Sequence, residues 1–243
     1  IYARDLNAQG AMAILLKDAI RPNLVQTLEG NPAILHGGPF ANIAQGTNTI
    51  IATKMGLSLA DFVVTEAGFG ADLGAEKFMH IKGYYGNLKP DAYVLVATIR
   101  ALRYHGGAKK GEYEKPNLAA VEKGIENLKK HIENGFKWQL KPIVAINHFA
   151  TDSEEEINFV KAECEKLGVK AILADEFTMG GEGMKALAEE VASCAFNCGN
   201  HFKPLYSVED SVEHKIETIA KEVYGADSAV FSQKAKNQLK SIY

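Results

Sequence analysis

The hydrophobic positions of this chain fall into short apolar runs that alternate with longer stretches of helical periodicity. The short runs are bounded mostly by Gly, Pro, Asn or Asp and predict strands at 32–35, 62–66, 91–98, 142–147 and 169–173. The longer stretches predict helices at 3–20, 44–55, 117–134, 153–167, 183–194 and 211–224. Strands separated by such helices need crossover connections, so we predict an α/β fold with a mostly parallel sheet flanked by helices.

Two helix ends carry local signals. The Arg21-Pro22 step stops the first helix, because proline disfavours helical geometry in the residue before it. Thr151 and Glu154 have the spacing of a capping box, and Asp152 is an alternative cap, so either marks the start of the helix that follows.

Ligands of parallel sheets bind just beyond the carboxyl ends of the strands, which directs attention to the loops there. These loops span 36–46, 67–74, 105–111, 148–152 and 174–183. Four of the five are rich in glycine. We therefore expect the chemistry of the chain to lie in these loops.

Composition narrows the classes of function. The chain has 243 residues, of which 47% are hydrophobic and 23% charged, as in an average globular protein. Its formal net charge of −3 leaves no basic surplus for a nucleic-acid partner, and no apolar run is long enough to cross a membrane. The three cysteines form no paired framework, which favours a reducing, cytoplasmic setting.

The start of the chain is unusual. Residue 1 is Ile, not Met, and it already begins an ordered pattern without a targeting segment. We expect the chain to be a piece of something longer, although processing would give the same start.

The loop that begins at His36 combines a histidine with Gly37 and Gly38 between a strand and a helix. Glycines let the backbone approach a ligand closely, and a helix N-terminus favours an anion. His36 is therefore a candidate for work on a proton or a phosphate. A tight turn without any ligand is the alternative.

Segment 65–78 is the densest in polar residues and holds three glycines and three carboxylates, which suits phosphate or metal handling. Phe69 lies between Gly68 and Gly70, a poor position for a core residue and a good one for an exposed stacking face.

Several familiar motifs are absent. The sequence contains no G-x-x-x-x-G-K-[ST] phosphate loop, no H-E-x-x-H and no G-x-S-x-G. Cys194 and Cys198 lie one helical turn apart near His201, but a buried pair of small apolar residues explains them better than a metal site. We predict no metal ligands.

Two further strand-end loops each carry an aromatic residue near the tip, Phe149 in one and Phe177 in the next. The two rings could face each other across a slot for a flat heteroaromatic ligand, each stacking contact contributing about 1 kcal/mol. Alternatively, both rings close the end of the sheet.

These loops resemble, in order, those of the formate–tetrahydrofolate ligase family. The matching segments are HGGPFANIAQGTN (36–48), VTEAGFGADLGAEKF (64–78), VAINHFATDSEEE (144–156), GGEG (180–183), FKPLY (202–206) and IETIAKEVYGAD (216–227). The resemblance implies ATP-dependent ligation of formate to tetrahydrofolate through formyl phosphate, which gives 10-formyltetrahydrofolate for one-carbon metabolism. It also implies a multidomain P-loop fold, a cytoplasmic homotetramer, a requirement for Mg²⁺ and a possible monovalent cation.

Individual roles follow from the resemblance. Phe149 and Phe177 would sandwich the pterin, Phe69 would close the pocket, and His36 would lie near the transferring group as the catalytic residue. The glycines expected around formyl phosphate are Gly37, Gly38, Gly68 and Gly70. The residues expected to order the folate pocket are Asn147, Asp152 and Glu182.

The resemblance also suggests how the chain is organised. Residues 1–107 would be the remainder of the nucleotide and formyl phosphate domain, and 108–243 the folate-binding domain. The family's P-loop lies upstream of these motifs and a C-terminal portion follows them, so we expect the isolated chain to be inactive. A non-catalytic folate- or phosphate-binding module, or an oligomerisation piece, is the alternative.

The chain departs from the family pattern at four places. The family usually has His at Gln45, Cys-Asn-Ser at 47–49, Pro at Ala150 and Trp at Phe177. We therefore expect the folate slot to retain an aromatic ring at both positions, with a smaller ring at 177 that stacks less strongly.

Overall fold

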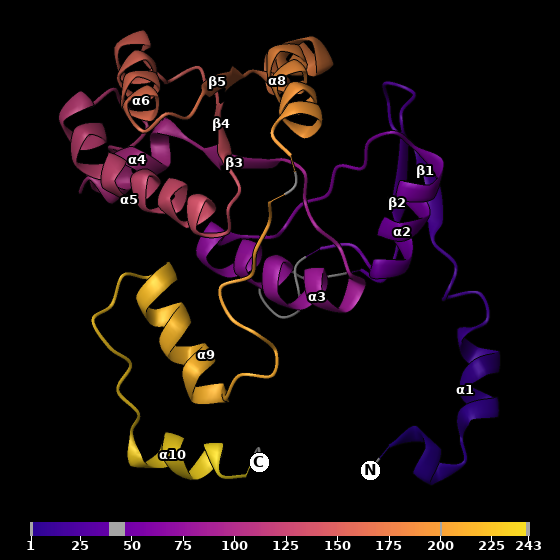
Figure 1. Ribbon diagram of the computed structural model, residues 1–243. Helices are drawn as coiled ribbons and strands as arrows, with labels where there is room; N and C mark the ends of the chain where they lie inside the picture. Colours follow the sequence, from indigo (N-terminus) through magenta and orange to yellow (C-terminus); the bar gives the residue numbers. More distant parts are fainter. Residues whose placement is uncertain (1, 39–46, 200, 242–243) are drawn as a thin grey trace. The chain divides into compact units, whose positions relative to one another are not determined.

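The computed structural model describes residues 2–38, 47–199 and 201–241 (Figure 1). Contacts divide the chain into two compact units, unit 1 at Ile1–Leu88 and unit 2 at Lys89–Tyr243. The predicted helix start at Ala44 and the departure at Gln45 lie outside the described residues. The predicted functional boundary after residue 107 falls within unit 2 and stays a prediction.

Unit 1 contains an antiparallel hairpin rather than a strand of a parallel sheet. Strand β2 (Pro32–Leu35) has the predicted bounds, but its partner β1 (Asn23–Gln26) was not predicted. The predicted strand at 62–66 is wrong, because that segment forms no ladder with any described residue. Its Val63 side chain instead lies close to Gly56 of the helix before it.

The helices of unit 1 are shorter than the periodicity suggested. The predicted helix at 3–20 is divided into η1 (Ala3–Leu6) and α1 (Gln9–Leu16) by Asn7, which adopts left-handed geometry. Helix α2 (Ile50–Leu59) begins at the Thr49 cap. Two π-helical turns and a short helix follow: η2 (Gly70–Ala75), η3 (Phe78–Lys82) and α3 (Gly83–Gly86).

Unit 2 confirms the α/β class. Its strands β3 (Tyr93–Ala97), β4 (Pro142–Asn147) and β5 (Ala171–Ala174) form a parallel sheet in the order β3-β4-β5. Three of the predicted strands are thus confirmed. The central strand β4 is buried along nearly its whole length, which explains its continuous apolar run.

Helices flank this sheet. The main ones are α4 (Ile99–His105), α5 (Leu118–Lys137), α6 (Glu154–Lys166) and α8 (Lys185–Asn197). Ile143 and Ala145 of β4 pack against Leu187 and Cys194 of α8. Figure 1 shows α8 on one side of the sheet and α4 with α5 on the other. Strand β3 leads through Thr98 directly into α4, so the predicted strand-end loop at 105–111 follows a helix and not a strand.

The remaining helices of unit 2 are short. They are α7 (Glu176–Met179), η4 (Gly180–Met184), α9 (Val212–Thr218), the π-helical η5 (Ile219–Val223) and α10 (Gln233–Leu239). Asn134 of α5 donates a hydrogen bond of 3.1 Å to the carbonyl of Val223, which joins η5 to α5. None of the described helices combines the length and apolar composition that a membrane crossing requires.

The cap of α6 differs from the predicted one. Ser153 caps the helix and forms a capping box with Glu156, two residues beyond the predicted pair. Thr151 and Asp152 belong instead to the preceding turn, and Asp152 accepts a hydrogen bond from the backbone of Phe149. The acidic run at 154–156 offers the same spacing in two registers, so the sequence alone chose the wrong one.

Helices α4 and α5 cross with their backbones in close contact. A Cβ atom on Gly124 of α5 would lie 1.9 Å from the carbonyl oxygen of Leu102, and one on Gly106 would lie 1.7 Å from that of Ala120. Both obstacles are backbone atoms that cannot turn away. The crossing therefore requires glycine at both positions.

We predict that Gly124→Ala lowers the unfolding free energy by at least about 2 kcal/mol, because α5 must move off α4. Lys123→Ala is the matched control, since it changes an exposed residue of the same helix with a cost within about 0.5 kcal/mol. Urea denaturation of both variants checks this, and equal stabilities would contradict the close crossing.

Candidate functional site

The carboxyl edge of the sheet in unit 2 is formed by loops that leave adjacent strands at the same level. Asn147 of β4 pairs with Ala174 of β5, and the His148 amide donates a hydrogen bond of 2.9 Å to the Ala174 carbonyl. The loops carrying Phe149 and Phe177 therefore begin side by side, as the sequence predicted. Thr98 marks the end of β3 at the same edge, where it caps α4.

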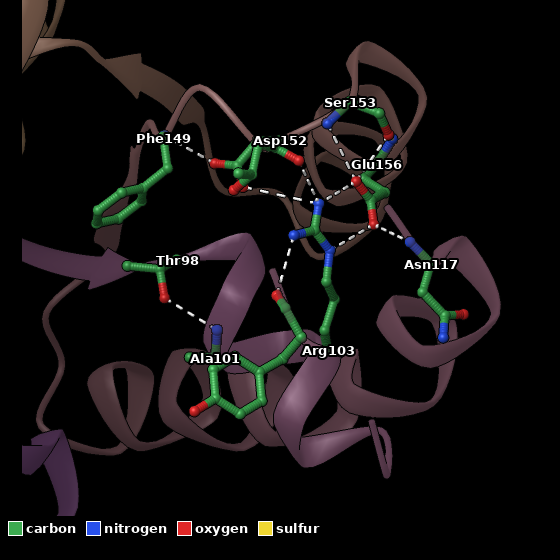
Figure 2. Close-up of polar contacts among 10 residues, drawn as sticks. Thr98, Ala101, Arg103, Asn117, Phe149, Asp152, Ser153 and Glu156 are labelled. Carbon is green, nitrogen blue, oxygen red and sulfur yellow. Dashed lines mark hydrogen bonds and ion pairs between the residues drawn. The ribbon is translucent and has the colours of Figure 1, made fainter. Parts of the chain in front are cut away.

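Phe149 lies on a turn that is closed by Asp152, three residues further along the chain. Its amide donates to Oδ2 of Asp152 at 2.9 Å, and the Asp152 amide donates to the Phe149 carbonyl at 2.9 Å (Figure 2). Phe149 as a whole residue is 42% exposed, whereas the carboxylate of Asp152 is buried. Burial raises the pKa of Asp152, against the opposing effects of the Phe149 hydrogen bond and the Arg103 charge.

Phe177 lies on α7 and is 95% exposed. Its ring therefore does not close the end of the sheet. The loop around it is narrow at the base, where the Asp175 amide donates to the Gly183 carbonyl at 3.3 Å. A Cβ on Gly183 would lie 2.2 Å from the Asp175 carbonyl oxygen, so only glycine fits there. Glu182 is exposed on η4 of the same loop.

One side-chain contact joins these two loops. Nδ1 of His148 lies 3.6 Å from Oδ2 of Asp175, an ion pair when the imidazole is protonated. The other oxygen of Asp175 is buried without a hydrogen-bond partner in the described structure. Nothing in the sequence singled out this pair, because only the folded sheet brings residues 27 positions apart together.

In unit 1, His36 is held at both ring nitrogens. Nε2 lies 2.9 Å from the carbonyl of Ala19, so this nitrogen carries the proton, and Nδ1 lies 2.8 Å from Oγ1 of Thr49. In the neutral form Nδ1 accepts from that hydroxyl, whose oxygen also accepts from the Ala52 amide as the cap of α2. His36 is thus oriented by the start of the next helix.

The glycines after His36 have distinct roles. Gly37 adopts a φ of +80°, and a Cβ there would lie 2.6 Å from Cγ2 of Thr49. The contact between His36 and Thr49 therefore depends on glycine at 37. Gly38 also has positive φ, +49°, and a Cβ there would meet nothing within 4 Å.

The second glycine-rich loop of unit 1 presents Phe69. Its ring is 83% exposed, and it lies between Gly68 and Gly70, which both have positive φ. A Cβ on Gly74 would lie 2.3 Å from the carbonyl of Ala67, so the loop is pressed against the helical turn that follows it. The expectation of an exposed aromatic face at this position agrees with the structure.

A buried lysine is a feature that sequence reasoning missed. Lys82 is 2% exposed, and its ammonium group donates to Oγ1 of Thr47 at 3.0 Å. Thr47 in turn lies 3.0 Å from the hydroxyl of Thr65, which donates to the carbonyl of Glu66. Burial lowers the pKa of Lys82 from 10.5 to about 8. This chain of hydrogen bonds joins the loop after β2 to the segment that leads to Phe69.

The described residues offer no prepared metal site. They contain no group of three or more His, Cys, Asp or Glu side chains that could hold an ion. Cys194 is buried, which raises the pKa of its thiol to about 11, helped by a hydrogen bond with Cys198. Cys198 is exposed, so the expectation of a buried pair holds only for Cys194.

Together, the parallel sheet and its strand-end loops define an α/β protein with a candidate ligand-binding edge in unit 2. The family model described as formate–tetrahydrofolate ligase matches residues 1–243, and the chain belongs to this family. The family implies ligation of formate to tetrahydrofolate in one-carbon metabolism, with ATP and tetrahydrofolate as substrates. Of the predicted site residues, His36 and Phe69 with their glycines lie in unit 1. Those in unit 2 are Asn147, Phe149, Asp152, Phe177 and Glu182.

We predict that the buried ammonium group makes unit 1 more stable as the pH rises from 8 to 10.5. In this window the folded chain has released the Lys82 proton while the unfolded chain still binds it, so the unfolding free energy increases with pH. The gain over Lys82→Met should be on the order of 1–2 kcal/mol. Denaturation at several pH values measures the difference, and a constant difference would contradict the assignment.

Proposed function

We propose that this chain binds tetrahydrofolate at the carboxyl edge of its parallel sheet, for the ATP-dependent formation of 10-formyltetrahydrofolate. The observation that carries the proposal is the pair of exposed phenylalanine rings on loops that leave adjacent strands. Exposed aromatic rings on fixed loops are costly to hydrate and suit a flat ligand. Family membership supplies the identity of that ligand.

In this proposal the pterin stacks between Phe149 and Phe177. The two loops are fixed at their bases, one by the Asp152 turn and the other by the contact of Asp175 with Gly183. In this proposal the bases of both loops are therefore already ordered before the ligand arrives, which reduces the entropy lost on binding. The polar groups of the pterin need partners, and Asn147 and Glu182 stand at the ends of the two loops that border the slot.

Asp152 has a different part in the proposal. Its carboxylate is buried and already accepts the Phe149 amide, so it orders the turn from behind and leaves pterin contact to other residues. In this proposal Asp152 contributes to the pocket by orienting the Phe149 ring.

The second substrate is formyl phosphate, which we place at the glycine-rich loops of unit 1. The tetrahydrofolate amine attacks the formyl carbon, the bond from this carbon to the phosphate oxygen breaks, and the amine loses its proton as phosphate leaves. No protein nucleophile is required, so the protein acts by positioning and by stabilising charge on the phosphate. The glycines at 37, 38, 68 and 70 allow close approach of the backbone to such an anion.

His36 is the proposed catalytic residue near the transferring group. Its Nε2 proton points at the Ala19 carbonyl, a neutral oxygen that a phosphate oxygen can replace as acceptor. Thr49 fixes the other ring nitrogen and thereby sets the direction of this donor. Phe69, exposed between its two glycines, offers an aromatic face beside the glycines proposed for formyl phosphate.

ATP and its Mg²⁺ complete the reaction, but no site for them is evident in the part of the chain that the structure describes. The sequence lacks the G-x-x-x-x-G-K-[ST] cradle, and the described residues lack a cluster of metal ligands. We propose that Mg²⁺ accompanies the nucleotide, that a monovalent cation assists, and that the working enzyme is a cytoplasmic homotetramer. These points rest on the family resemblance.

We predict that Phe149→Ala and Phe177→Ala each weaken tetrahydrofolate binding about fivefold, the equivalent of one lost stacking contact. Phe136→Ala is the matched control, because Phe136 is also 42% exposed but lies at the end of α5 that precedes β4. Phe177→Trp keeps an aromatic ring and should bind at least as tightly. Titration of the four variants checks this, and unchanged affinity in both alanine variants would remove the slot.

We also predict that the chain alone neither hydrolyses ATP nor forms formyl phosphate with formate and magnesium. Phosphoryl transfer needs a backbone cradle, a lysine on the β- and γ-phosphates and a hydroxyl on the metal, and no segment supplies the three together. A coupled assay measures this. Turnover near about 1 s⁻¹, the low end for enzymes, would contradict it. Folate binding without turnover fits the non-catalytic alternative for the isolated chain.

A further inference from the structure

Behind the turn that carries Phe149 lies a fully buried arginine that the proposed chemistry does not use. Arg103, on α4, donates Nε to Oε1 of Glu156 at 2.8 Å and Nη2 to Oε2 at 2.6 Å. Its Nη1 donates to the Tyr113 carbonyl at 3.1 Å, and Nη2 also donates to the Thr151 carbonyl at 2.9 Å. Figure 2 shows the guanidinium group at the centre of these contacts.

Glu156 is equally committed to this network. Besides the two bonds from Arg103, its carboxylate accepts from the Asn117 amide at 2.8 Å and from the amide and hydroxyl of Ser153 at 3.1 and 2.7 Å. Burial alone would raise the pKa of Glu156, but the hydrogen bonds from Arg103, Asn117 and Ser153 outweigh it and lower the pKa to about 2. The carboxylate is therefore charged at neutral pH.

The network reaches Phe149 through two consecutive residues of its turn. Arg103 holds the Thr151 carbonyl directly. Its Nη2 also lies 3.8 Å from Oδ1 of Asp152, a buried oxygen that has no hydrogen-bond partner in the described structure. The other oxygen of the same carboxylate receives the Phe149 amide. The arginine charge thus compensates the carboxylate that orients Phe149.

We propose that Arg103 is a positioning residue for the pterin slot, acting on Phe149 through Thr151 and Asp152. This inference rests on the proposed folate site. A buried ion pair adds little net stability compared with apolar residues of similar volume, because removing both charges from water is costly. What the pair provides here is geometry, since one planar guanidinium group fixes Tyr113, Thr151 and Glu156 at once.

Arg103 itself touches no ligand in this account. Its side chain is fully buried, so its effect on folate must pass through the turn. Arg103→Lys tests this because it keeps the positive charge but loses the planar fork that holds Tyr113, Thr151 and Glu156 together. The turn should then open more often, and tetrahydrofolate should bind at least about tenfold more weakly than to the unchanged chain.

A control separates positioning from general loss of stability. Val160 is fully buried on α6 and belongs to none of these hydrogen bonds, so Val160→Ala destabilises the same unit while leaving the turn intact. All affinities are measured at a temperature where each variant is folded. The second readout is hydrogen exchange of the Phe149 amide, which should accelerate in Arg103→Lys and not in Val160→Ala.

The outcomes decide the proposal as follows. Weaker folate binding together with faster exchange at Phe149, both confined to Arg103→Lys, supports it. Equal affinities in the two variants, or a Phe149 amide that stays protected in Arg103→Lys, overturns it. If Arg103→Lys does not fold, the double variant Arg103→Met with Glu156→Leu takes its place, and wild-type folate affinity in that variant overturns the proposal.

A failure of the proposed folate site can be distinguished from a failure of the proposal for Arg103. If the unchanged chain does not bind tetrahydrofolate, or Phe149→Ala binds as well as the unchanged chain, the proposed function fails. The exchange of the Phe149 amide still decides whether Arg103 fixes the turn.

Discussion

The buried pairing of Arg103 with Glu156 is the contact through which the helices of unit 2 determine the position of the turn that carries Phe149. The glycine crossing of α4 and α5 comes first, because it brings α4 close enough for Arg103 to lie beneath the turn. Glu156 joins the start of α6 to the same guanidinium group. Only then is the turn at Asp152 closed and Phe149 held at the edge of the sheet. A substitution at the crossing of α4 and α5 should therefore alter the position of the Phe149 ring.

In unit 1, threonine hydroxyl groups hold two side chains, His36 and Lys82, in place. Thr49 caps α2 and orients His36, and Thr47 receives the buried ammonium group of Lys82. Asn48 between them donates to the Ile34 carbonyl and so fixes this tripeptide to β2. The hydroxyl oxygen of Thr47 accepts from the lysine and leaves its own proton for Thr65, so threonine suits both contacts.

The sequence predicted the parallel sheet because apolar runs alternate with helices long enough to serve as crossovers, and the central strand β4, buried on both faces, reads as a continuous apolar run. The run at 62–66 looks the same, yet it finds no ladder partner among the described residues, and a pattern of side chains cannot reveal that. Strand β1 was missed because its polar ends, Asn23 and Gln26, hide a two-residue apolar centre. Asn7 divided a helix whose periodicity ran straight through it, and π-helical turns such as η3 shift the period on which the prediction relies.

The neighbouring strand-end loops were predicted from the sequence, whereas the contacts that support them were missed. The strand-end rule found the loops of Phe149 and Phe177 because topology places them together whatever their side chains do. Arg103 and Lys82 were overlooked because arginine and lysine side chains are normally exposed to solvent. The available signal for Arg103 was the Ser153 and Glu156 capping pair, whose carboxylate has capacity for a further partner. The contact of His148 with Asp175 has no counterpart in sequence spacing.

The central claim is that a pterin lies between Phe149 and Phe177, and the most direct measurement observes those rings while the ligand binds. The chain would be labelled at phenylalanine and titrated with tetrahydrofolate under anaerobic conditions, with ring proton shifts followed by NMR. The account predicts large ring-current shifts at Phe149 and Phe177 with a common dissociation constant, and no such shift at Phe136. Saturable binding that leaves both rings unshifted would contradict it.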